Sequence, residues 1–159
     1  MNFYTIGVYN SNEKEFFDKL ITNEIDIFCD IRQRRGVRGS KYSFVNSKKL
    51  QSKLNDLGIK YFHYLDLAPT TEIREMQKVA DLRNHELKRD RKSLGEVFIN
   101  EYKNQIINYF NFAVFLDDLK KNNANNVVLF CVEESYNACH RSIVAEKLSS
   151  DYKLHIKNI

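Results

Sequence analysis

The stretch VVLFCV, residues 127–132, is a continuous run of apolar side chains that follows an Asn-rich segment. A strand with one wet face alternates apolar and polar residues, whereas a strand buried on both faces reads as an unbroken apolar run. Strands of the second kind occur in parallel sheets that carry helices on both faces. The stretch therefore predicts a buried strand of an α/β fold.

Strand and helix patterns alternate along the rest of the chain. The apolar runs that predict further strands lie at residues 3–8, 26–31, 60–64 and, more weakly, 152–156. Helical spacing of apolar residues is found at residues 12–22, 47–57, 101–121 and 139–149. This alternation predicts one α/β domain over residues 1–159, with a mainly parallel sheet flanked by helices in a three-layer, Rossmann-like arrangement.

The composition is that of a globular protein. The chain has 159 residues, 43% of them hydrophobic, which suits one folded domain. Its three cysteines do not form an even set for a disulfide framework, so we expect reduced thiols and a cytoplasmic location. The opening MNFYTIGVYN lacks the features of a signal peptide, and no apolar stretch reaches membrane-spanning length. We therefore expect no membrane partner.

Positive charge is concentrated in one part of the chain. Residues 31–55 contain no Asp or Glu, and their basic residues are Arg32, Arg34, Arg35, Arg38, Lys41, Lys48, Lys49 and Lys53. Because like charges repel, this cluster indicates an anionic partner or, alternatively, a solvated surface beside an acidic patch. Residues 70–92 carry dense charge of both signs at helical spacing, which predicts a mostly exposed helix.

Polar residues also gather where the predicted strands end. The run at 26–31 contains Asp30 and is followed by Arg32, His63 lies in the run at 60–64, and Glu133 follows VVLFCV. Ligands of parallel α/β sheets bind beyond the carboxyl ends of the strands, which meet at one edge. We therefore expect these side chains at one rim of the sheet.

The sequence CHRS, residues 139–142, stands at the predicted start of the last helix. Free N–H groups at a helix start favour an anion, and Arg141 would add a bidentate clamp. The thiol of Cys139, beside His140, would act as a nucleophile there. The structural alternative makes Cys139 a small buried apolar residue and pairs Arg141 with Glu133 or Asp30.

A zinc site built from Cys131, Cys139, His140 and His63 is conceivable from the residue types. Their spacing matches no compact zinc signature, and the chain has neither a P-loop nor a GxGxxG motif. The sequence therefore predicts no metal and no cofactor.

Four segments together resemble one known family. They are YTIG (4–7), CDIRQRRGVRGSKYSF (29–44), LGIKYFHYLDLAP (57–69) and FCVEESYNACHRSIVAEKL (130–148). The chain is similar to the domain of unknown function 488 family, α/β proteins of bacteria and archaea. The family's Asp-Val-Arg, Cys-x-Glu and Cys-His-Arg motifs fall on residues 30–32, 131–133 and 139–141. The basic QRRGVRGSKY and the LAPT at 67–70 resemble a subgroup of it. The resemblance implies an α/β fold and a shared polar rim, without an established reaction.

Three functions follow from these features. The first is binding of nucleic acid or a phosphorylated small molecule at the rim, with the aromatic ring of Tyr42 placed for stacking on bases. The residues expected to bind are Arg32, Arg34, Arg35, Arg38, Lys41, Tyr42, His63, Glu133, Arg141 and Ser142. The second is an enzyme in which Asp30 orients or acts as a base and Cys139 or His140 supplies the nucleophile or acid/base group. The third is a partner-binding role for the helix at 70–92.

Overall fold

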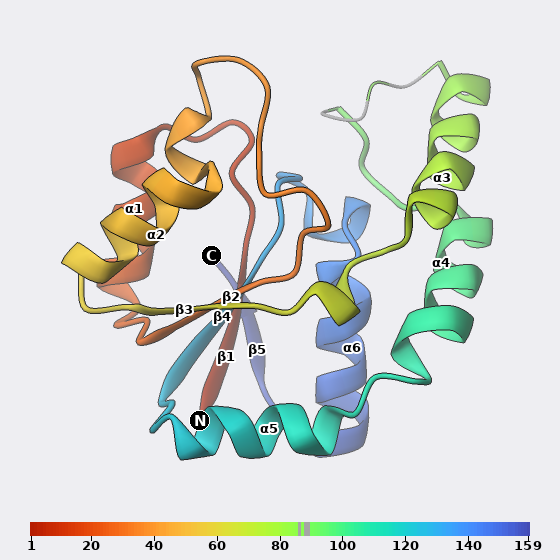
Figure 1. Cartoon of the computed structure of the whole chain (residues 1–159). Helices are drawn as coiled ribbons and strands as arrows, with labels where there is room; N and C mark the ends of the chain where they lie inside the picture. Colours follow the sequence, from red (N-terminus) through yellow and green to blue (C-terminus); the bar gives the residue numbers. More distant parts are fainter. Residues whose placement is uncertain (86, 88–89) are drawn as a thin grey trace.

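The computed structural model describes residues 1–85, 87 and 90–159. Within these residues, five strands form one parallel sheet in the order β3-β2-β4-β1-β5 (Figure 1). The strands are β1 (Asn2–Ile6), β2 (Ile27–Asp30), β3 (Lys60–His63), β4 (Asn126–Phe130) and β5 (Ile156–Asn158). The predicted α/β fold with a parallel sheet is confirmed. The strand within VVLFCV is β4, the central one, and its Phe130 is level with Ile6 of β1 and Asp30 of β2.

Helices cover both faces of the sheet (Figure 1). On one face α1 (Glu13–Thr22) and α2 (Ser47–Asp56) pack on Phe28, Val128 and Phe130. The opposite face, with Ile27, Val127 and Leu129, packs against α5 (Phe112–Lys121) and α6 (Arg141–Tyr152). Successive side chains of β4 thus enter two separate cores. This explains why its sequence is apolar without interruption.

A break divides the helix expected over residues 101–121. The structure has α4 (Glu96–Tyr102), a π-helical turn (Lys103–Ile107) and then α5, which runs in a new direction (Figure 1). The side chain of Asn111 accepts a hydrogen bond from the backbone N–H of Val114 at 3.1 Å and so caps α5. The apolar spacing through this segment favours one continuous helix, whereas the Asn cap favours a new helix start at this point, and the structure has the new start.

The last two elements are shifted along the chain from their expected positions. α6 begins at Arg141 and continues to Tyr152, where a helix over 139–149 and then a strand over 152–156 were expected. Lys153 has a φ of 56° in the left-handed region, which ends the helix, and β5 follows at Ile156.

The densely charged segment is only partly helical. α3 spans Thr71–Arg83 and packs against α4 (Figure 1), so Ile73, Gln77 and Asp81 are buried rather than exposed. The rest of the expected helix over 70–92 is not continuous with α3, because the chain turns at His85, whose φ is 52°. Residues 86, 88 and 89 lie outside the described residues.

Across the described part of the chain, none of the helices combines the length and the apolar character that crossing a bilayer requires.

Candidate functional site

The main chain of the rim is built by the extension of β4 between its neighbours. The N–H of Cys131 donates to the carbonyl of Ile6 at 3.3 Å, which prolongs the pairing with β1. Gly7 then passes so close to the next segment that a Cβ atom built on it would lie 2.1 Å from the carbonyl oxygen of Glu133. Only a glycine fits this contact, which brings the end of β1 against the residues that follow β4.

Asp30 and Arg32 form a buried ion pair at the end of β2. Nε of Arg32 donates to Oδ1 of Asp30 at 2.8 Å and Nη2 donates to Oδ2 at 2.7 Å, a bidentate geometry. The guanidinium also lies 4.5 Å from the ring centre of Phe130, and its Nη2 donates to the carbonyl of Val45. Its Nη1 is buried and has no hydrogen-bond partner among the described residues.

Tyr61 of β3 completes the surroundings of Asp30. Its hydroxyl donates to Oδ2 of Asp30 at 2.8 Å. Burial, with the added effect of the Asp30 charge, raises the pKa of Tyr61 to about 12. The hydroxyl therefore remains a donor at neutral pH, and Asp30 is fully engaged by Arg32 and Tyr61.

Cys131, Cys139 and His140 form a second, separate cluster. Nε2 of His140 lies 3.0 Å from the carbonyl oxygen of Ile31. Because a carbonyl only accepts, Nε2 carries a hydrogen, and Nδ1 faces the sulfurs of Cys131 and Cys139, 3.8 Å away in each case. Sγ of Cys131 also contacts Oε2 of Glu133 at 3.1 Å. Each of these side chains is buried.

The electrostatics of the cluster favour a thiolate. Burial opposes ionisation of Cys139, but the contact with the Cys131 thiol and the positive charge of His140 outweigh it and lower the pKa of Cys139 to about 5. Burial also opposes the charge on His140, yet the neighbouring Cys139 raises its pKa. A thiolate beside an imidazole can act as a nucleophile or as a metal ligand.

Two buried arginines lie next to this cluster. Arg141, at the start of α6, donates through Nη1 to the carbonyl of Glu133 and through Nη2 to that of Glu134 at 2.9 Å. Arg91 donates to Asp81 at 2.9 Å and to the carbonyl of Ala138 at 2.8 Å, and its Nη2 lies 3.5 Å from Oε1 of Glu133. The two cations thus hold the segment between β4 and α6 in place.

Sequence reasoning missed Arg91 and its partner Asp81. Both lie in the segment interpreted as a mostly exposed helix. The available signal was the four-residue spacing of Ile73, Gln77 and Asp81, which places the two polar residues on the same face of α3 as the apolar Ile73. Gln77 donates to Asp81 at 2.6 Å and accepts from the N–H of Gly95 at 2.8 Å, so this polar face is internal.

The basic residues after Arg32 lie on the surface. Arg34, Arg38 and Lys41 are exposed on the loop between β2 and α2. Arg35 is half-buried, and its positive charge acts on the Tyr61 hydroxyl in the direction of a lower pKa, against the larger effect of burial. The ring of Tyr42 packs on that of Tyr9, 5.2 Å between centres, and lies 5.1 Å from Nζ of Lys41, so it is not a free stacking platform.

The remaining predicted residues have structural contacts. Nε2 of His63 lies 2.9 Å from the carbonyl oxygen of Arg32, and Oγ of Ser142 donates to the carbonyl of Cys139 at 2.8 Å. Since α6 begins at Arg141 with His140 as its N-cap residue, Cys139 precedes the helix instead of starting it.

The rim residues therefore divide into two groups. Asp30 contacts Arg32 and Tyr61, whereas His140 contacts the main chain of Ile31. Asp30 was expected to orient a group or act as a base; its observed partners are Arg32 and Tyr61, and the partner of His140 is the Ile31 carbonyl.

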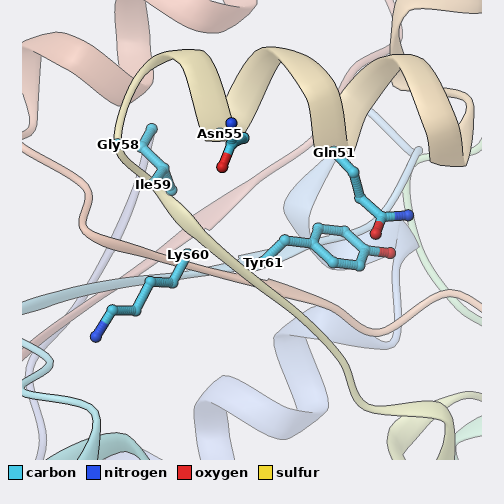
Figure 2. A pocket seen from close by; sticks show the side chains of 6 residues that line it. All are labelled: Gln51, Asn55, Gly58, Ile59, Lys60 and Tyr61. Carbon is cyan, nitrogen blue, oxygen red and sulfur yellow. The ribbon is translucent and has the colours of Figure 1, made fainter.

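A hollow opens on the surface beside the first group. It lies under α2 at the sheet edge and is lined by Gln51, Asn55, Gly58, Ile59, Lys60 and Tyr61 (Figure 2). The Tyr61 ring extends along this hollow below Gln51, while the chain of Lys60 points away from it (Figure 2). Because the Tyr61 hydroxyl reaches Asp30, the hollow is connected to the rim by one side chain.

The chain was compared with known families, curated proteins and solved structures. A family model described as "Domain of unknown function DUF488" matches residues 12–148, a range that includes both groups of rim residues. The searches of curated proteins and of solved structures returned no match.

Proposed function

The chain belongs to the DUF488 family, whose description names no reaction. From the charge on the surface of this chain, we propose that it binds nucleic acid through the basic loop of residues 33–43. The phosphate backbone would supply the negative charge that this loop lacks. A reducing compartment, the cytoplasm, suits a protein whose three cysteines are thiols.

The observation that carries this proposal is the lack of acidic partners around the loop. Within the described residues, no carboxylate forms a salt bridge with Arg34, Arg38 or Lys41. Other exposed lysines do form such pairs, with Lys14 bound to Asp18 and Lys120 to Asp117. This supports an anionic partner as the source of the missing negative charge.

The loop is tied to the start of α2, which supports a role in presenting charge. The N–H of Val37 donates to the side chain of Asn46 at 2.6 Å, and the N–H of Ser47 donates to the carbonyl of Arg35 at 2.9 Å. Holding the loop at these two points lowers the entropy lost when a ligand binds. The hollow beside Tyr61 adds the amide groups of Gln51 and Asn55, which suit hydrogen bonds to sugar or base.

We expect the triple variant Arg34→Gln, Arg38→Gln, Lys41→Gln to bind a fluorescent single-stranded oligonucleotide at least about tenfold more weakly at low salt. The logarithm of the binding constant should also depend less steeply on the logarithm of salt concentration, by about 2 for three lost contacts with a single strand. Fluorescence anisotropy over a salt series measures both quantities.

The matched control is Lys14→Gln, Lys78→Gln, Lys120→Gln, which removes the same charge from exposed lysines that already pair with acids. It should keep the wild-type salt dependence. An equal loss in both variants would mean that net charge rather than the loop attracts the strand, and no binding by the wild type at low salt would overturn the proposal. Full competition by a mononucleotide at matched phosphate concentration would instead identify a nucleotide site.

A further inference from the structure

The cluster behind the rim has a geometry that the proposed nucleic-acid contact does not use. We propose that Cys131, Cys139, His140 and Glu133 bind a zinc ion. The exposed loop and this buried cluster share no side chain, so the inference stands apart from the proposed function.

The spacing of the donor atoms fits one ion. Sγ of Cys131, Sγ of Cys139 and Nδ1 of His140 all lie within 4.8 Å of one another, with both sulfur–nitrogen distances at 3.8 Å. With Zn–S near 2.3 Å and Zn–N near 2.0 Å, tetrahedral ligands stand about 3.5 Å apart, sulfur to nitrogen. The cluster therefore needs only small side-chain movements to close on a metal.

The histidine is held as metal-binding histidines are held. Its Nε2–H donates to the carbonyl of Ile31 at 3.0 Å, which fixes both the tautomer and the ring orientation. Histidine ligands of zinc usually donate their second N–H to a carbonyl or carboxylate in this way. Nδ1 is consequently the nitrogen left to bind a metal, and it faces the two sulfurs.

Glu133 lies just outside this group of three, and its carboxylate would turn toward the ion to supply the fourth donor. Its Oε2 lies 3.1 Å from Sγ of Cys131, while its Oε1 lies 3.5 Å from Nη2 of Arg91. One carboxylate oxygen can thus turn to the metal while the other remains with the cation. Two thiolates and a carboxylate around a divalent ion leave one negative charge, which Arg91 and the neighbouring Arg141 offset.

Burial distinguishes this arrangement from a nucleophilic cysteine. Cys139 is 1% exposed and His140 is 5% exposed, whereas a nucleophile needs a reacting atom within about 3.5 Å. A Cys-His dyad would also leave the second thiol, Cys131, without a role. A four-ligand structural site is closed to solvent and uses both thiols.

Cobalt(II) is the probe for the test, because it takes tetrahedral thiolate sites and absorbs light. Titration of the reduced, metal-depleted full chain should give thiolate-to-cobalt charge-transfer absorption and intense visible bands that saturate at one ion per chain. Zn²⁺ should abolish these bands by displacement. If the reduced wild type gave no such absorption, the proposed site would not exist.

The variants separate ligation from folding. Cys131→Ser and Cys139→Ser should each weaken cobalt binding by about 100-fold or more and reduce the charge-transfer band, whereas Glu133→Gln should keep that band and bind about tenfold more weakly. Cys29→Ser is the matched control, because Cys29 is a buried thiol of β2 outside the cluster. Unchanged binding in both cluster variants would place the ion elsewhere.

A measurement on the wild-type chain tests the site even if the cysteine variants fail to fold. Saturating Zn²⁺ should protect Cys131 and Cys139 from iodoacetamide in mild denaturant by a larger factor than Cys29, as peptide mass spectrometry would report. Zn²⁺ should also raise the wild-type melting temperature. Equal alkylation of the three cysteines with and without zinc would overturn the proposal.

Discussion

Replacing Arg32 with methionine is expected to lower the free energy of unfolding by about 3–5 kcal/mol, as found when one partner of a buried ion pair is removed. Methionine keeps an apolar chain against Phe130 but removes both guanidinium bonds to Asp30. The carboxylate would then stay buried with only the hydroxyl of Tyr61 and the N–H of residue 32 as donors. Chemical denaturation, with an unchanged dependence on denaturant, measures the loss.

The double variant Asp30→Asn, Arg32→Met tests the cause. Because it removes the buried charge along with its partner, it should recover at least half of the stability lost in Arg32→Met. Lys14→Met serves as the control, since its pair with Asp18 is exposed, and it should leave the denaturation midpoint unchanged. If Arg32→Met behaved like this control, the Asp30–Arg32 pair would not stabilise the fold.

The sheet was predictable because a strand that is buried on both faces has an uninterrupted run of apolar residues. β4 alternates between two apolar cores, so no polar residue interrupts VVLFCV. The limits of the helices were harder to predict, since they depend on competition between neighbours. The apolar period continues past Phe110, but the cap formed by Asn111 starts a new helix.

The rim was predictable in location but not in pairing. The carboxyl ends of parallel strands meet at one edge, and this rule brought Asp30, Arg32, Cys131 and His140 to the same part of the molecule. Which of them touch depends on side-chain direction. Asp30 and Arg32 are two residues apart and so share a side, whereas Ile31 between them offers its carbonyl to His140.

The internal position of Arg91 depends on tertiary structure. Its segment is rich in both charges, which is typical of a solvated helix. In the fold, Arg91 bonds to Asp81 of α3 and to the carbonyl of Ala138, which lies just before α6. Both partners are within reach of Arg91 only because α3 lies near the start of α6. The pattern of charges along the sequence does not show that Arg91 and the carbonyl of Ala138 are close in space.

The variant Gly7→Ala is expected to lower the free energy of unfolding by about 3 kcal/mol, at the upper end of the usual cost of overpacking. The new Cβ would lie 2.1 Å from the carbonyl oxygen of Glu133 and 3.2 Å from Nη2 of Arg141. Because the nearer atom belongs to the main chain, no side-chain rotation relieves the clash. Either β1 or the segment after β4 must move, and thermal and chemical denaturation would report the loss.

Gly36→Ala is the matched control, because no atom lies within 4 Å of the Cβ position and the backbone there suits any residue. It should leave stability unchanged or raise it slightly, since alanine narrows the unfolded ensemble. A movement of Glu133 in Gly7→Ala would also displace the carboxylate from Cys131, so that cobalt binding should weaken in any Gly7→Ala protein that remains folded. Equal stability of the two variants would mean that β1 and the Glu133 carbonyl are farther apart in solution than in this structure. The position of the Glu133 main chain would then depend on its hydrogen bond from Arg141 and not on the contact with Gly7.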